Sequence, residues 1–519
     1  MRLVQRLGLG ALLALLAAPL AAQRAQWLTF GHDPQRSGWT REETAFTPQS
    51  VPRLTLLWKA QLANQPRSLN GLTAPLIANV ATPHGREAMV FVAGSSDHLF
   101  ALAAATGKTV WQDDFVATQK APDAGMWLCP NALNDTPVID AARQRLFIIA
   151  ADGRLHTVAL ADGTEIGKPF RFVPAYSKMW SLNYVDGTLY TSISQGCAGA
   201  VSGVAAVDPD APGHPVTTFW SAPNGAGVWG RGGPSADFKG DILAATGDAG
   251  LDPQGGVLGD SVLRLQAKTL NRLDFYTPPN WAYLNKLDLD LATSTPVVFR
   301  WRDRVLTAGG GKEGVAYLLD TANLGSNDHH RAADVTPRLA NASQTFEKFG
   351  IWGTMSSWQE PDGTVWLVIP TWGPPAPTAP AFPVRNGAAP DGSLMAFRVT
   401  ADAAGQPRLT PAWISSDIAV PEPAAIAGGV VFVLANGENT QQVYNGDIHK
   451  LVGDRGTLPQ QQAKLFALDA HDGRALWDSG TTIQDWTHFS GLAIGADEVV
   501  MVTHSGQVYA FGLGGAPQP

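Results

Sequence analysis

The sequence predicts an all-β protein: a single eight-bladed β-propeller, closed by pairing of its N- and C-terminal segments. One strand motif recurs eight times at intervals of about 45–80 residues, the length that a four-stranded blade and its loops require. The 519 residues include 54 Gly, 37 Pro and 17 Trp, which is typical of many short strands joined by turns and anchored by large aromatic side chains. The same counts argue against a mainly helical protein.

The clearest copies of the motif are two hairpins of equal length. Residues 465–477 read LFALDAHDGRALW, and residues 99–111 read LFALAAATGKTVW. Each combines an alternating strand, a tight turn that contains Gly, and a second strand that ends in Trp. Weaker copies of the first strand begin at Thr157, Gly203, Ser261, Ala316, Leu394 and Val508.

The copy that begins at Val508 reaches the C-terminus without its second, Trp-bearing strand. Residues 54–62, LTLLWKAQL, can supply that strand from the other end of the chain. Closure of this kind removes the free edges that a row of sheets would otherwise expose. We therefore assign residues 24–519 to one propeller.

Residues 1–22 have the order of a secretory signal peptide: Arg2 and Arg6, an apolar stretch over residues 7–16, and small residues up to Ala22. We exclude this segment from the fold and expect a periplasmic or secreted protein; an uncleaved anchor is the alternative. No later stretch is apolar over the roughly 18 residues of a membrane span, so no stable membrane insertion is expected.

Composition and motifs also exclude several functional classes. The net charge is −8 and no run of Lys or Arg interrupts it, which argues against a nucleic-acid partner. No CxxCH motif for covalent heme c, Gly-rich phosphate loop or Ser nucleophile elbow is present. Eleven His residues show no zinc-type spacing with Cys, so solvated or capping loop histidines are the default interpretation.

The hairpins of the LFALDAHDGRALW type resemble the repeats of pyrroloquinoline-quinone (PQQ) dehydrogenases and their relatives, as does the opening WLTFGHDPQRSGW. The resemblance covers nearly the whole mature chain but implies fold more than activity, because non-catalytic outer-membrane assembly propellers share it. Two functions follow. One is an exported quinoprotein-like oxidoreductase that oxidises an alcohol or related small molecule and passes electrons to a separate acceptor protein. The other is a cofactor-free scaffold that binds a ligand or assembles partners.

In the quinoprotein alcohol dehydrogenases, a base Asp lies in a Trp-Asp-Tyr-Asp-like element, and a Lys or Arg that contacts the quinone follows some two dozen residues later. LDLD at residues 287–290 and Lys312 in GGGKEGVAYLLD resemble this pair. The resemblance implies Asp288 as general base and metal ligand, Asp290 as a further carboxylate of the sort found with a lanthanide, and Lys312 as quinone contact. Alternatively, the carboxylates begin a strand and Lys312 occupies a Gly-rich turn.

Residues 226–253 resemble the family element that supplies a Trp beneath the quinone and a metal-binding Asn. The resemblance implies Trp229 for the ring and Asp248 for calcium or a lanthanide, both of which prefer hard oxygen ligands. Arg231 stands where a second aromatic residue would fall, and its guanidinium can stack on a ring or bind a carboxylate substrate.

The chain also departs from the family in two ways. Family dehydrogenases carry two adjacent Cys residues against PQQ, whereas Cys129, near the expected cofactor face, is followed by Pro130. The region SQGCAGAVSGVAAVD lacks the metal-binding Glu of the family. Since Cys129 and Cys197 precede successive blade strands in loops that we interpret as corresponding, an oxidising compartment favours a disulfide between them; two isolated thiols are the alternative.

Several Trp residues outside the repeats are expected either to line one stacking pocket or to pack between blades. They are Trp127, Trp180, Trp229, Trp281, Trp352, Trp372 and Trp486. Two insertions, residues 370–391 and 436–462, are long for hairpin connections and are interpreted as a cap over one face or as surface padding.

Overall fold

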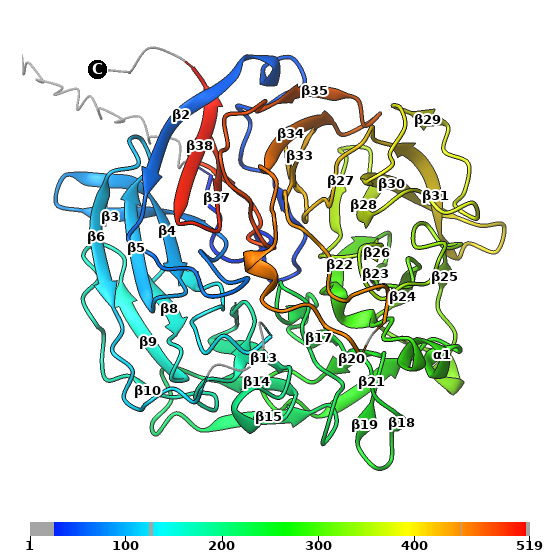
Figure 1. Cartoon of the computed structure of the whole chain (residues 1–519), viewed down its shortest axis with the longest axis horizontal. Coiled ribbons are helices and arrows are strands. Elements are labelled where there is room, and N and C mark those ends of the chain that lie inside the picture. The colour runs from blue at the N-terminus through cyan, green and yellow to red at the C-terminus, as the bar shows by residue number, and fades with distance from the viewer. Residues whose placement is uncertain (1–24, 124–127, 448, 515–519) are drawn as a thin grey trace, which may run out of the picture.

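The computed structural model describes residues 25–123, 128–447 and 449–514 and confirms the eight-bladed propeller. The chain passes once around the ring, so that consecutive blades are neighbours and the last blade meets the first (Figure 1). The signal peptide expected over residues 1–22 lies outside the described residues. Within the described ranges, no helix has the length and apolar character needed to span a membrane.

Each blade is a sheet of at least four strands. Blades 1 and 2 contain β3 (Leu76–Thr82), β4 (Gly85–Gly94), β5 (His98–Ala103) and β6 (Thr109–Asp114), then β7 (Val138–Asp140), β8 (Arg145–Ile149), β9 (Arg154–Ala159) and β10 (Phe170–Arg171). Blade 3 contains β11 (Lys178–Met179), β12 (Asn183–Val185), β13 (Thr188–Ser194), β14 (Gly203–Val207) and β15 (Val216–Trp220). Blade 4 contains β16 (Ser235–Ala236), β17 (Ile242–Ala245), β20 (Val262–Leu265) and β21 (Arg272–Tyr276).

The second half of the ring follows the same plan. Blade 5 contains β22 (Val297–Trp301), β23 (Arg304–Gly310), β24 (Ala316–Asp320) and β25 (Asp334–Val335). Blade 6 contains β26 (Gly350–Ile351), β27 (Ser356–Gln359), β28 (Val365–Trp372), β29 (Val384–Arg385), β30 (Gly392–Ala401) and β31 (Pro407–Ile414). Blade 7 contains β1 (Trp39–Thr40), β32 (Ala425–Ala427), β33 (Val430–Ala435), β34 (Lys464–Asp469) and β35 (Ala475–Asp478). Blade 8 contains β36 (Ala493–Gly495), β37 (Glu498–Val502), β38 (Gln507–Leu513) and β2 (Leu54–Gln61).

The repeated sequence motif has a packing explanation. Its Trp reaches from one blade to the turn of the next: the Trp413 indole donates to the carbonyl of Ala470 at 2.9 Å. A Cβ at Gly473 would lie 2.3 Å from the Trp413 ring, and Gly473 has φ of 73°, so only glycine fits this turn. Trp58 and Gly107 repeat the contact between blades 8 and 1. Trp and Gly therefore recur together because they form one blade-to-blade joint.

The predicted closure is confirmed. Strand β2 pairs antiparallel with β38, with Leu54 opposite Leu513 and Gln61 opposite Gln507. A second closing contact was not predicted: β1 pairs in parallel with β32 of blade 7, Trp39 opposite Ile426. The N-terminal segment thus contributes strands to blades 7 and 8, the last two blades along the chain. These pairings stabilise the closed ring.

Candidate functional site

The propeller encloses a cavity of about 560 Å³. Residues from blades 3 to 7, from the connection between blades 1 and 2, and from the connection between blades 7 and 8 line it, which only a position near the axis of the ring permits. Of the Trp residues outside the repeats, Trp180, Trp229, Trp352 and Trp372 line the cavity, whereas Trp281 and Trp486 do not. Trp127 lies outside the described residues. Part of this set therefore lines the expected pocket.

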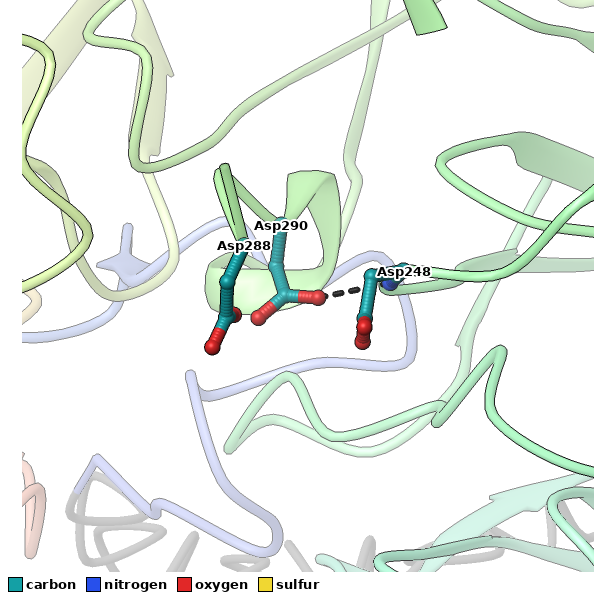
Figure 2. A group of neighbouring side chains, drawn as sticks. All are labelled: Asp248, Asp288 and Asp290. Carbon is teal, nitrogen blue, oxygen red and sulfur yellow. Dashed lines mark hydrogen bonds between the residues drawn. The ribbon is translucent and has the colours of Figure 1, made fainter. Parts of the chain in front are cut away.

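Three aspartates from two connections meet at one end of the cavity (Figure 2). Asp248 follows β17, while Asp288 and Asp290 lie between helix α1 (Trp281–Lys286) and β22. One carboxylate oxygen from each lies within 4.8 Å of the others, a spacing that a single cation can bridge. The sequence analysis proposed these three as metal ligands, and the fold brings them together.

Local backbone geometry explains how Asp288 and Asp290 point into the same space. Helix α1 ends after Lys286, and Asp288 takes a left-handed conformation with φ of 54°. This turn lets Asp290 lie beside Asp248, whose backbone N–H donates to Asp290 Oδ1 at 2.6 Å. A non-glycine residue in this conformation requires support from its surroundings, and such residues concentrate at functional sites.

Lys312 holds two of the carboxylates. Its Nζ lies 2.5 Å from Asp288 Oδ1 and 2.6 Å from Asp290 Oδ2, and its side chain is buried. Lys312 follows the Gly-rich end of β23, and its backbone N–H donates to the carbonyl of Asp290 at 3.0 Å. One ammonium faces three carboxylates, so the group carries excess negative charge when all are ionised.

The three carboxyl groups differ in pKa. Burial opposes ionisation of Asp290, but the Lys312 charge and hydrogen bonds outweigh it and hold its pKa below the usual range. Burial raises the pKa of Asp288 to about 6, against the opposing charge of Lys312. Partial withdrawal from solvent and the charges of Asp290 and Asp288 raise the pKa of Asp248 to about 7. The environment thus separates one permanent anion from two groups that titrate near neutrality.

Two glycines leave room for Asp290. A Cβ at Gly247 would lie 2.4 Å from Asp290 Oδ1, and one at Gly311 would lie 2.2 Å from the Asp290 carbonyl oxygen. Both distances are too short for any side chain. Gly247 therefore lies against the carboxylate of Asp290 and Gly311 against its backbone carbonyl, which helps the hydrogen bond from Asp248 and the ion pair with Lys312 to fix the residue.

We expect Gly247→Ala to lower the affinity of the protein for calcium or a lanthanide by about tenfold or more, as changes behind a metal ligand usually do. The methyl group displaces the Asp290 carboxylate while all three aspartates remain. Titration with europium, read by its luminescence, measures the effect. Gly250→Ala is the matched control, because its Cβ meets only Val257 Cγ1 at 3.9 Å. Unchanged affinity in Gly247→Ala would contradict this account.

Aromatic rings form one wall of the cavity. The rings of Trp352 and Trp372 stack at 4.8 Å with an interplanar angle of 11°, and Phe489 continues the stack at 5.5 Å and 17°. Trp229 lies against Trp352 at 5.9 Å. We call Trp352, Trp372 and Phe489 the aromatic strip. Lys312 adjoins one end of it, 5.6 Å from the Trp352 ring.

Arg231 adjoins the other end of the strip. Its guanidinium carbon lies 4.7 Å from the Phe489 ring and 4.4 Å from that of Trp180. Its Nη2 donates to His488 Nε2, while His488 Nδ1 contacts Glu438 Oε2 at 2.6 Å. Burial outweighs the Glu438 charge and lowers the pKa of His488 to about 3, so the imidazole is neutral and accepts from Arg231.

The resemblance did not identify the groups behind Arg231. Glu438 also pairs with Arg455 at 2.5 Å, and both side chains are buried. The sequence analysis treated the histidines as loop residues, and Glu438 lies in the insertion 436–462 without a recognisable motif. The residues behind Arg231 are far apart in the sequence, and only the folded structure shows that they are in contact.

The disulfide prediction is confirmed: Cys129 and Cys197 are bonded, with their Cα atoms 5.4 Å apart. The interpretation of their loops as corresponding is wrong, because Cys129 precedes the first strand of blade 2, whereas Cys197 lies between β13 and β14 of blade 3. Long blade connections converge near the axis, which is why non-equivalent loops can meet. Cys129, expected at the cofactor face, does not line the cavity; its neighbour Leu128 does.

The two insertions differ. Residues 436–462, the segment between β33 and β34, cross the middle of the ring (Figure 1) and contribute Gln442, Leu451 and Arg455 to the cavity. From residues 370–391, only Trp372 lines the cavity, and β29 pairs in parallel with β31 at blade 6. The first of these segments therefore covers the site, and the second mainly extends a blade.

Comparison with known proteins agrees with this architecture. A family model described as the outer membrane protein assembly factor BamB matches residues 51–229. No curated protein sequence matches the chain significantly. A europium-containing methanol dehydrogenase is similar in structure, with a TM-score of 0.61 and 13% identity over 94% of this chain and 98% of that one. The quinohemoprotein alcohol dehydrogenase from Comamonas testosteroni has a TM-score of 0.58 and 14% identity, over 95% of this chain and 81% of that one.

These comparisons define a class. The chain is a β-propeller with PQQ-like repeats, and it shares its fold with the quinoprotein alcohol dehydrogenases. At such low identity the likeness concerns the fold, so function must be argued from the cavity and its side chains.

Proposed function

We propose that this protein is an exported quinoprotein-like oxidoreductase, which oxidises an alcohol or related small molecule at a metal-assisted quinone site. The observation that carries the proposal is the convergence of Asp248, Asp288, Asp290 and Lys312 at one end of a single cavity walled by aromatic rings. The residues come from blade 4, blade 5 and the connection between them, and a structural role does not require this combination of carboxylates, ammonium and an aromatic cavity wall.

The side chains present fit the two groups that this function needs. Three carboxylates within 4.8 Å form a hard oxygen donor set suited to calcium or a lanthanide, although the family Glu has no counterpart. Trp229, whose ring lies 5.6 Å from the Lys312 ammonium, would contact a planar quinone such as PQQ, and the aromatic strip remains free beside it. Asp248, Asp290 and Asp288 would hold the cation, and Lys312 would contact the quinone oxygens.

When bound, PQQ would supply a hydride acceptor and the cation a Lewis acid. Asp288 accepts the proton of the substrate hydroxyl, since its carboxylate lines the cavity and is half-exposed there. Asp290 remains ionised beneath it and balances the charge of Lys312. Without a CxxCH motif, electrons pass to a separate acceptor protein rather than to a heme c on this chain.

A scaffold function is the second candidate, because the matching family model is described as an assembly factor. A scaffold has no need for the cavity or its carboxylates. Ligand binding and turnover therefore distinguish the two candidates better than any fold comparison.

The test is reconstitution of the mature protein with PQQ and either calcium or a lanthanide. We expect stoichiometric quinone binding, followed by its absorbance, and dye-linked oxidation of alcohols. Asp248→Ala is expected to weaken binding, because it removes one donor without touching Lys312. Absence of quinone binding with either metal would overturn the oxidoreductase proposal and favour the scaffold.

A further inference from the structure

The cavity has two ends of opposite charge. At the end opposite the three aspartates lie Lys178, Arg231 and Arg455, with Glu438 as the ionised acid among them. Burial raises the pKa of the Glu422 carboxyl to about 7, so this acid balances them only in part near neutral pH. The aromatic strip connects the two ends. This second end is not used by the proposed oxidation chemistry.

Lys178 is the unusual member of this group. It lies on β11, opposite Ser194 of β13, and is only 5% exposed. Its ammonium lies 5.2 Å from the Trp180 ring, and no carboxylate of the described residues forms an ion pair with it. Burial, reinforced by the charges of Arg231 and Arg455, lowers its pKa well below the ordinary value. A buried, unpaired lysine destabilises a fold unless a ligand compensates it.

Arg231 faces the same space. Its guanidinium shares the Trp180 ring with Lys178, and one of its terminal nitrogens is occupied by neutral His488. Lys178 and Arg231 therefore both contact one aromatic ring at the cavity wall, and both side chains line the cavity. An anionic group would satisfy both at once.

We propose that Lys178 and Arg231 form a subsite for a carboxylate of the substrate, and that the oxidised molecule is an aromatic or otherwise planar hydroxy acid. This inference rests on the proposed function, which puts the reacting hydroxyl at Asp288. The carboxylate then binds at the cationic end, the planar part lies along the aromatic strip, and the hydroxyl reaches the acidic end. Each part of such a molecule matches the chemistry of the wall that it meets.

The first test measures binding without quinone. In the mature protein, para-(hydroxymethyl)benzoate is expected to bind at least about tenfold more tightly than its neutral amide, para-(hydroxymethyl)benzamide. A charge-assisted contact in a buried site accounts for a difference of this size. Lys178→Met is expected to remove this preference. Lys168→Met, at an exposed lysine of blade 2, is the control. Equal affinities for acid and amide, or a preference retained in Lys178→Met, would overturn the proposal.

Thermal unfolding separates a binding role from a structural one. Met keeps the length and packing of Lys178 while removing the buried charge, so the melting temperature of the ligand-free protein is expected to rise. A fall in melting temperature together with lost binding would assign Lys178 to the fold and overturn the proposal.

A third measurement distinguishes the substrate carboxylate from those of the cofactor, since PQQ itself carries carboxylates. The affinity of Lys178→Met for PQQ with calcium is expected to remain within about threefold of the parent protein, well under the tenfold effect of one lost charged contact. If quinone affinity falls and the hydroxy acid preference stays, the cations serve the cofactor and the proposal fails. If quinone never binds, the proposed oxidation fails, but selective binding of the benzoate still supports the carboxylate subsite.

Discussion

Asp288→Asn is expected to lower kcat of the quinone- and metal-loaded protein by about 10²–10⁴-fold, the range for loss of a positioned general base. Asn has nearly the same shape and can still accept a hydrogen bond from Lys312, whose Nζ lies 2.5 Å from the Asp288 carboxylate. It cannot accept the hydroxyl proton. Dye-linked turnover under saturating alcohol measures the effect, and quinone absorbance checks that cofactor remains bound.

The control is Asp303→Asn, an exposed carboxylate in the turn between β22 and β23. It changes the same charge on a neighbouring blade and should leave kcat unchanged. Retention of more than a tenth of the activity in Asp288→Asn, a loss of under about 1.4 kcal/mol in barrier terms, would show that another group takes the proton.

The pH dependence of cation binding gives an independent check on the same residue. Because burial raises the pKa of Asp288 to about 6 in the metal-free protein, its carboxyl is protonated below that value and cannot bind a cation. Affinity for europium should therefore fall as pH decreases through about 6. Asp290, whose pKa is held low, contributes no such dependence. A weaker pH dependence in Asp288→Asn would assign it to this group.

The fold could be predicted from the sequence because several blades repeat one packing joint. The Trp and Gly of this joint, such as Trp413 and Gly473, recur together along the sequence. The spacing of the blades is therefore visible without an alignment. The parallel pairing of β1 was not predictable, since two residues are too few for any periodic pattern. The wrong interpretation of the Cys129 and Cys197 loops as corresponding has a similar cause: loop lengths vary without any residue pattern that would mark their place in a blade.

The acidic end of the site could be proposed only through a family resemblance, because LDLD and a distant Lys carry little information alone. The cationic end had no such guide. Lys178 lies on a two-residue strand and Glu438 in a long loop, and neither stands in a motif. Their importance comes from burial and from partners on other blades, which depend on how the ring closes. Charge balance within a cavity is a property of the folded chain.

Loss of the disulfide is expected to have the largest effect on stability. Cys129 and Cys197 are 68 residues apart, and closing a loop of that length in the unfolded chain corresponds to about 4 kcal/mol in the chain-entropy model, at the upper end of the usual range of about 2–4 kcal/mol. Cys129→Ser/Cys197→Ser should therefore lower the denaturant midpoint clearly. Because Leu128, Gly196 and Gly199 line the cavity beside the bond, ligand affinity should fall together with stability.

Parent protein treated with reductant, which keeps both sulfur atoms, distinguishes loss of the cross-link from loss of packing. If its midpoint matches that of the untreated protein, the bond stabilises neither the fold nor the cavity wall.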